Sequence, residues 1–234
     1  MSSELVFMLF AESTLVTNIA IAVTIDDFLS ELGGIAACRL MLDPPPGQAT
    51  LDDLVRVNDY AKRRLVELID STLVEKAKGY EASVVAAAIL NILRNFVVAN
   101  RLGVVSGADG MFQLRSSVRG PAVGYVARER LPNQKFPSES YPALEPNLVV
   151  EVLSPGNTKG EMTRKRLEYF HSNVQIVWIV DCINRSVAAY TSPSKVRVYS
   201  EEETIDGGLA IPGFTASVSD FFNDLDIGLD VADE

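Results

Sequence analysis

The pattern of apolar and polar residues divides the chain into a helical N-terminal part and a longer part that alternates strands with helices. In TIDDFLSELGG (24–34), apolar spacing predicts a short helix that Thr24 caps and the glycine pair ends. Three prolines in LDPPPGQAT (42–50) forbid a helix, because proline fixes φ and lacks an N–H. A second amphipathic helix is predicted over LDDLVRVNDYAKRRL (51–65).

The longer part begins with a predicted hairpin and a long helix. LVELIDSTLVEK (65–76) reads as two short strands about a turn at Asp70 and Ser71. EASVVAAAILNILRNFVVANR (81–101) is apolar on most sides, so we expect a helix buried against a sheet and ended by Gly103.

Strand-like runs dominate the rest of the chain: GVVSGADGMFQL, AVGYVA, NLVVEVL, QIVWIVD, and then the hairpin-like pair SVAAYT and KVRVYS. A helix with a capping-box start at Thr158 is predicted over TKGEMTRKRLEYFHS (158–172), between the third and fourth runs. This order predicts an α/β fold with a mixed sheet flanked by helices. NLVVEVL and QIVWIVD are continuously apolar, which is typical of central strands covered on both faces.

We therefore divide the chain into four parts. Residues 1–23 are a leader of unknown role, and residues 24–64 are an N-terminal helical extension with a Pro-rich linker. Residues 65–223 form the α/β domain, and residues 224–234 are an acidic tail.

Composition narrows the classes of function. The chain has 234 residues, 47% of them hydrophobic and 22% charged, as in soluble globular proteins. A net charge of −10 argues against a general polyanion-binding surface, and TRKR (163–166) is the one dense basic run. Cys38 and Cys182 lack metal-ligand spacing and fit a reducing compartment. With no signal peptide or membrane helix in the sequence, we expect a cytoplasmic protein without membrane contact.

Glu151 is the first candidate for chemistry, because it lies inside the aliphatic run NLVVEVLSP (147–155). Burial of an ionised carboxylate is costly unless the group is paired or binds a metal. Two interpretations are open: Glu151 reaches water or an arginine at the strand end, or it is a metal ligand there, where sites in such sheets open.

Lys165 is the second candidate, on the predicted helix that follows. Met162, Lys165 and Tyr169 have helical spacing, so the lysine flanks the apolar stripe that faces the sheet. Arg166 flanks the other side of the same stripe, and spacing does not choose between the two cations. The alternative is that both keep their charges in solvent while their stems cover the core.

Other residues suggest structural roles. His171, the one histidine, is placed at the end of a helix, and Asp181 at the end of a strand before a turn. No Ser-His-Asp, Cys-His or zinc-ligand pattern is present, and the glycines of SGADG lack the Lys-Ser/Thr of a phosphate loop.

Several blocks in one order resemble the PD-(D/E)XK nuclease superfamily, in particular the Uma-type restriction endonucleases. They begin near residue 24 and include PPPGQAT, ELIDSTLVEKAKGYEAS, GVVSGADGMFQL, RGPAVGYV, EPNLVVEVLSPGNTKGEMTRKRLEYF, VWIVD and LAIPGF. The resemblance implies a restriction-endonuclease-like fold and hydrolysis of phosphodiester bonds in DNA with Mg²⁺ or Mn²⁺. It also implies a possible homodimer, since related nucleases commonly pair.

The resemblance also implies roles for individual positions. Glu151 falls on the catalytic metal-binding glutamate, and Lys165 on the lysine that this family carries on the following helix, which selects it over Arg166. The family aspartate after the proline of RGPAVGYV is Ala122, so one metal ligand is lost. Asp109 is the best substitute ligand and Glu81 the second, although a Gly-flanked turn and a helix start are the simpler explanations of these two acids.

Two functions are consistent with alanine in place of the family aspartate. The first is a metal-dependent endonuclease that is impaired because Ala122 replaces the family aspartate. The second is an inactive nuclease fold that serves as a binding or assembly module. Retention of Glu151 and Lys165 favours the first, and Ala122 favours the second.

Overall fold

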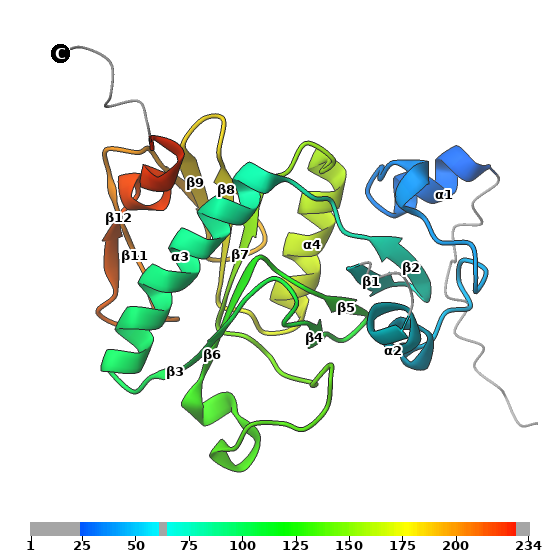
Figure 1. Cartoon of the computed structure of the whole chain (residues 1–234), viewed down its shortest axis with the longest axis horizontal. Coiled ribbons are helices and arrows are strands. Elements are labelled where there is room, and N and C mark those ends of the chain that lie inside the picture. Colours follow the sequence, from blue (N-terminus) through cyan, green and yellow to red (C-terminus); the bar gives the residue numbers. More distant parts are fainter. Residues whose placement is uncertain (1–23, 61–64, 228–234) are drawn as a thin grey trace, which may run out of the picture.

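A six-stranded mixed sheet forms the centre of the computed structural model, which describes residues 24–60 and 65–227 (Figure 1). The strand order is β10-β9-β8-β7-β6-β3. The strands are β3 (Gly103–Ser106), β6 (Val123–Ala127), β7 (Leu148–Val152), β8 (Ile176–Asp181), β9 (Ser186–Tyr190) and β10 (Val196–Tyr199). β7 and β8 are parallel, and the other neighbours are antiparallel. The predicted mixed sheet is confirmed.

Two helices cover this sheet: α3 (Tyr80–Ala99) and α4 (Lys159–His171). α3 buries a row of residues at helical spacing, namely Ala82, Val85, Ile89, Leu93 and Val97. These pack in one cluster with Leu148, Val150 and Val152 of β7. Val149 instead packs with Tyr169 of α4. Because side chains alternate across a strand, Glu151 belongs to the face that α4 covers.

α3 is long and apolar enough to cross a membrane by length and composition alone. One side of it nevertheless packs in the core of the domain, as a helix that covers a sheet does. It ends at Ala99 rather than at the predicted Gly103, which is the first residue of β3.

A second sheet, in the order β2-β1-β5-β4, lies beside α4 (Figure 1). It consists of β1 (Val66–Ile69), β2 (Thr72–Glu75), β4 (Phe112–Gln113) and β5 (Ser117–Arg119). β1 and β2 form the predicted hairpin, and Asp70 and Ser71 turn it with positive φ. The predicted single strand GVVSGADGMFQL is wrong, because it contributes β3 to one sheet and β4 to the other.

The N-terminal part contains α1 (Ile25–Glu31) and α2 (Leu51–Tyr60). Thr24 caps α1 by accepting a hydrogen bond from the Asp27 N–H, and residues 42–50 contain no helix, as predicted. The last part of the helix predicted over 51–65 lies outside the described residues, as do the leader and most of the tail. At the opposite end of the molecule, β11 (Thr204–Asp206) pairs with β12 (Thr215–Ser217) (Figure 1).

Candidate functional site

A cleft of about 590 Å³ opens at the end of β7, between α4 and the chain that leads from β2 into α3. Its charged side chains are Lys76, Lys78, Glu151 and Lys165. Ala122 contributes to the wall as well. The cleft therefore contains both residues that the sequence selected for chemistry and the position that lacks the family aspartate.

Glu151 enters the cleft from β7, and its side chain is 8% exposed. Its Oε1 atom accepts hydrogen bonds from the hydroxyl of Tyr169 at 2.6 Å and from Nζ of Lys165 at 3.2 Å. Burial together with this carboxylate raises the pKa of the Tyr169 hydroxyl well above its usual value. The acid is thus tolerated inside the strand because α4 supplies two donors to it.

Lys165 lies between two carboxylates and is 3% exposed. Its Nζ atom is 3.2 Å from Oε1 of Glu151 and 3.2 Å from Oε1 of Glu67. Burial alone would lower the pKa of this ammonium group, but the two carboxylates outweigh burial and raise it. Lys165 is therefore a charged group at the inner end of the cleft.

Arg166, the neighbouring cation, points elsewhere. Its guanidinium carbon lies 4.3 Å from the centroid of the Tyr190 ring, and the residue lines a different pocket. Lys165 and Arg166, between which helical spacing could not choose, therefore line different pockets. The alternative in which both keep their charges in solvent is wrong, because Lys165 is buried and paired.

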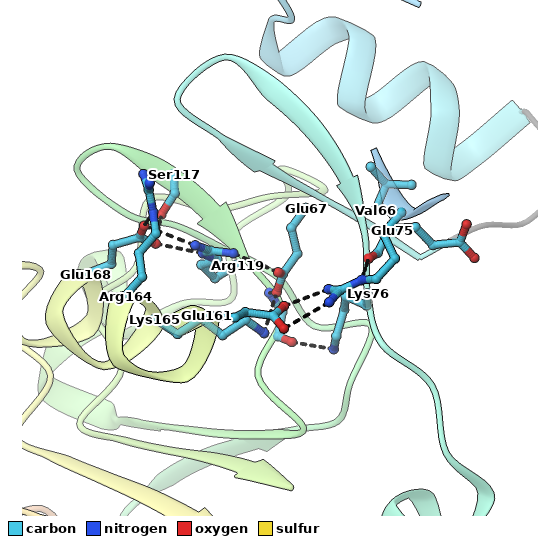
Figure 2. Close-up of polar contacts among 12 residues, drawn as sticks. Val66, Glu67, Glu75, Lys76, Ser117, Arg119, Glu161, Arg164, Lys165 and Glu168 are labelled. Atoms are coloured by element: carbon cyan, nitrogen blue, oxygen red, sulfur yellow. Dashed lines mark hydrogen bonds and ion pairs between the residues drawn. The ribbon is translucent and has the colours of Figure 1, made fainter. Parts of the chain in front are cut away.

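Glu67 is the residue that the sequence reasoning missed. It lies fully buried on β1, where its carboxylate accepts hydrogen bonds from Nη1 of Arg119 at 2.9 Å and from the Gly120 N–H at 3.1 Å. Figure 2 shows Arg119 between Glu67 and Glu168. Burial would raise the pKa of Glu67, but Lys165 and Arg119 hold it well below its usual value. The signal was present in the sequence as an acid within the aliphatic run VELI.

Lys76 is a second lysine of the cleft and follows β2 directly. Its ammonium group donates hydrogen bonds to the carbonyl oxygens of Gly120 and, at 3.2 Å, of Ala108. Burial lowers the pKa of Lys76, and the nearby positive charge of Lys165 adds to this effect, whereas Glu67 opposes it. No role had been assigned to this residue from the sequence.

Ala122 lies one residue before β6. Val123 pairs with Val150, so the antiparallel register places Ala122 opposite Glu151 on the neighbouring strand. An acid at this position would stand beside Glu151, whereas the methyl group of alanine offers no oxygen. The neighbouring positions that the sequence predicted for Ala122 and Glu151 are therefore present.

The substitute acids lie outside the lining of the cleft. Asp109 is exposed in the turn between β3 and β4, although its neighbour Ala108 lines the cleft. Glu81 is exposed at the start of α3 and lines the pocket that contains Arg166. Within residues 24–60 and 65–227, no group of three or more His, Cys, Asp or Glu side chains is arranged to hold a metal.

The remaining candidates have structural surroundings. His171 is exposed at the end of α4, and Asp181 accepts hydrogen bonds from the Ile183 and Asn184 N–H groups in the turn after β8. Cys38 and Cys182 are free thiols.

Known proteins resemble this chain in both sequence and fold. The model of the Uma2 family, described as "Putative restriction endonuclease", matches residues 52–219. A crystal structure described as "a putative nuclease belonging to DUF820" from Anabaena variabilis shares the fold, with a TM-score of 0.63 at 16% identity. The alignment covers 74% of this chain and 97% of that one. No curated protein matches the chain.

Proposed function

Because the chain belongs to the Uma2 restriction-endonuclease family, we propose that it engages the phosphodiester backbone of DNA in the cleft beside Glu151 and hydrolyses it with impaired efficiency. The observation that carries this proposal is the register of β6 and β7. It places Ala122 opposite Glu151, so that one residue of the expected metal-binding pair is missing while the other, with Lys165, is retained.

The retained residues can act on a phosphate group. The Lys165 ammonium has three donors; it donates to Oε1 of Glu151 and lies 3.2 Å from Oε1 of Glu67, so a donor remains for a phosphate oxygen. A fixed positive charge there stabilises the negative charge on the phosphoryl oxygens in the transition state of attack by water. Glu67 and Tyr169 position the lysine and the glutamate rather than touch the substrate.

The donor set does not fit the divalent cation that nucleases of this type generally use. Mg²⁺ requires near-octahedral oxygen ligands, usually one or two carboxylates together with waters and substrate oxygens. The Lys165 and Tyr169 hydrogen bonds to Glu151 both fall on Oε1, so Oε2 is the one oxygen that it offers to the cleft. Ala122 supplies nothing, and the oxygens of Glu67 are held by Arg119, Gly120 and Lys165. The residues present therefore hold such a cation poorly, and we infer impaired hydrolysis.

A plasmid cleavage assay in Mg²⁺ or Mn²⁺ tests this proposal. We expect the native chain to nick DNA weakly, and Ala122→Asp to increase nicking by at least about tenfold by restoring the second carboxylate. Addition of Glu151→Ala to Ala122→Asp should abolish the gain. Ala122→Asn is the matched control, because it has the same shape without the charge. If Ala122→Asp cuts no better than Ala122→Asn, the lost ligand does not explain the impairment.

The rival function is a nuclease fold that binds or assembles without cleaving. Ala122 is the observation that favours it, and the same assay separates the two functions. A native chain that is inactive in both metals, while its Ala122→Asp variant cuts, supports the binding module. Activity in the native chain that is lost in Glu151→Ala supports the enzyme.

DNA as the ligand and a homodimer rest on the family alone, whereas a cytoplasmic location rests on the composition and the cysteines of the chain. We propose DNA rather than RNA as the ligand, a homodimer in solution, and a cytoplasmic location. Light scattering of the purified chain tests the dimer, and competition between DNA and RNA of one sequence tests the ligand.

A further inference from the structure

The segment between β2 and α3, residues 76–80, forms one wall of the cleft. All five residues, Lys76, Ala77, Lys78, Gly79 and Tyr80, line it. Tyr80 is 90% exposed although it is a large aromatic residue. Buried tyrosines contribute to a core and bond through their hydroxyl groups, whereas this ring is presented to solvent beside two lysines. Neither the fold nor the residues around Glu151 account for this arrangement.

The charges of this wall suit an anion. Lys76 donates to two carbonyl oxygens, Gly120 O and Ala108 O, and an ammonium group carries three donors. A donor therefore remains to bond to a phosphate oxygen in the cleft, as for Lys165 on the opposite side. Lys78 adds a third ammonium group, which pairs with Glu75 at 2.5 Å while 62% of its side chain stays exposed. The lining of the cleft contains three lysines and one glutamate, on a chain whose net charge is −10.

Together with the proposed function, on which this inference rests, these observations indicate which form of nucleic acid enters the cleft. We propose that residues 76–80 bind single-stranded nucleic acid, with a phosphate group between Lys76 and Lys165 and an unpaired base stacked on the ring of Tyr80. Base–aromatic stacking needs a free base face, which a duplex covers with the neighbouring pair. Because lysines supply the positive charge, binding requires no divalent cation.

Fluorescence anisotropy with a labelled oligonucleotide of about 12 nucleotides in EDTA tests this inference, with the same sequence as a duplex for comparison. We expect the native chain to prefer the single strand. Tyr80→Ala should weaken single-strand binding by about 5- to 100-fold, the usual range for the loss of one stacked base. Tyr80→Phe, which keeps the ring, should stay within about twofold of the native affinity.

Two further variants separate charge from stacking. Lys76→Gln should weaken binding and reduce the dependence of affinity on salt, since one phosphate contact is lost. Phe136→Ala is the control for removal of an exposed ring, because Phe136 is 76% exposed and is not part of the cleft. It should bind as the native chain does. Circular dichroism should show native folding for Tyr80→Ala, as expected for an exposed side chain.

The outcomes distinguish this inference from the proposed function. Equal affinity of the native chain and Tyr80→Ala for the single strand, or a preference for the duplex, overturns the role of residues 76–80 and leaves the nuclease proposal intact. Failure of the native chain to bind either form overturns both. Stacking-dependent binding without any gain of cleavage in Ala122→Asp supports the binding wall and counts against the nuclease proposal alone.

Discussion

Glu67 and Glu151 are both acids inside aliphatic strands, but their carboxylates have different surroundings in the folded protein. Both are buried, and both contact Nζ of Lys165 at 3.2 Å. Glu67 also accepts hydrogen bonds from Arg119 and Gly120, so both of its oxygens are bonded and none of its surface is exposed. Glu151 lines the cleft, and among the described residues its hydrogen bonds from Lys165 and Tyr169 both fall on Oε1.

The number of bonded oxygens separates the two kinds of buried acid. A carboxylate whose oxygens are all bonded inside the protein orders its neighbours, and here Glu67 holds Lys165 and Arg119 in place. A carboxylate that is paired but still borders a cavity can meet a ligand. We therefore expect replacement of Glu67 to affect stability above all, and replacement of Glu151 to affect function above all.

Glu67→Gln should have the largest effect. It keeps the size of the side chain but leaves Arg119 and Lys165 with less buried negative charge, and breaking a buried ion pair costs about 3–5 kcal/mol. Urea unfolding followed by circular dichroism measures the loss of free energy of unfolding. Glu151→Gln is the matched control and should lose less, because its side chain borders the cleft. Equal losses in both variants contradict the distinction between the two acids.

Local patterns predicted much of this structure from the sequence. The helix starts at Thr24 and Thr158 and the hairpin turn at Asp70 and Ser71 depend on residues close together in the chain. The mixed sheet followed from the order of the apolar runs. Glu151 and Lys165 lie in one strand-turn-helix unit, but the family resemblance, not the local pattern, selected Lys165 over Arg166.

The remaining features depend on distant partners. Glu67 pairs with Arg119, which is 52 residues away in the sequence, and no local pattern predicts that contact. The capping box expected at Thr158 is only half formed: the Glu161 N–H donates to the Thr158 hydroxyl, while the Glu161 side chain pairs with Arg39 at 2.6 Å. β4 and β5 contain two and three residues, too few to show a period.

The two acids should also differ in their effect on the pH dependence of stability. The pKa of Glu67 is lowered from 4.5 in the folded protein, so its ionised form contributes stability that is present above about pH 5. This contribution is lost as the pH falls from there towards about 2. Glu67→Gln should therefore reduce the slope of unfolding free energy against pH in that window. Glu161 and Glu168, whose pKa values are also lowered, should preserve part of the slope. An unchanged slope would show that Glu67 does not titrate with unfolding.

The contact between Lys165 and Glu151 should have an intermediate effect. A double-mutant cycle with Lys165→Met and Glu151→Gln isolates their coupling from the other contacts of the lysine. We expect a coupling of about 1–3 kcal/mol in urea unfolding, because the pair is buried and hydrogen-bonded. The parallel cycle with Lys165→Met and Glu67→Gln should give a larger value, since Glu67 has no exposed surface. A larger coupling to Glu151 than to Glu67 reverses the ranking of the two acids.

Arg166→Gln should have the smallest effect and extends the comparison to the cations of α4. The Arg166 guanidinium lies over the ring of Tyr190, a contact worth about 0.5–1 kcal/mol where solvent reaches it. Lys165→Met, one residue away, removes a charge that two buried carboxylates require, so it should destabilise the protein several times more. Urea unfolding of the two variants side by side measures the ratio. If Arg166→Gln costs as much as Lys165→Met, burial between carboxylates does not distinguish Lys165, and the assignment of this lysine to the cleft loses its energetic support.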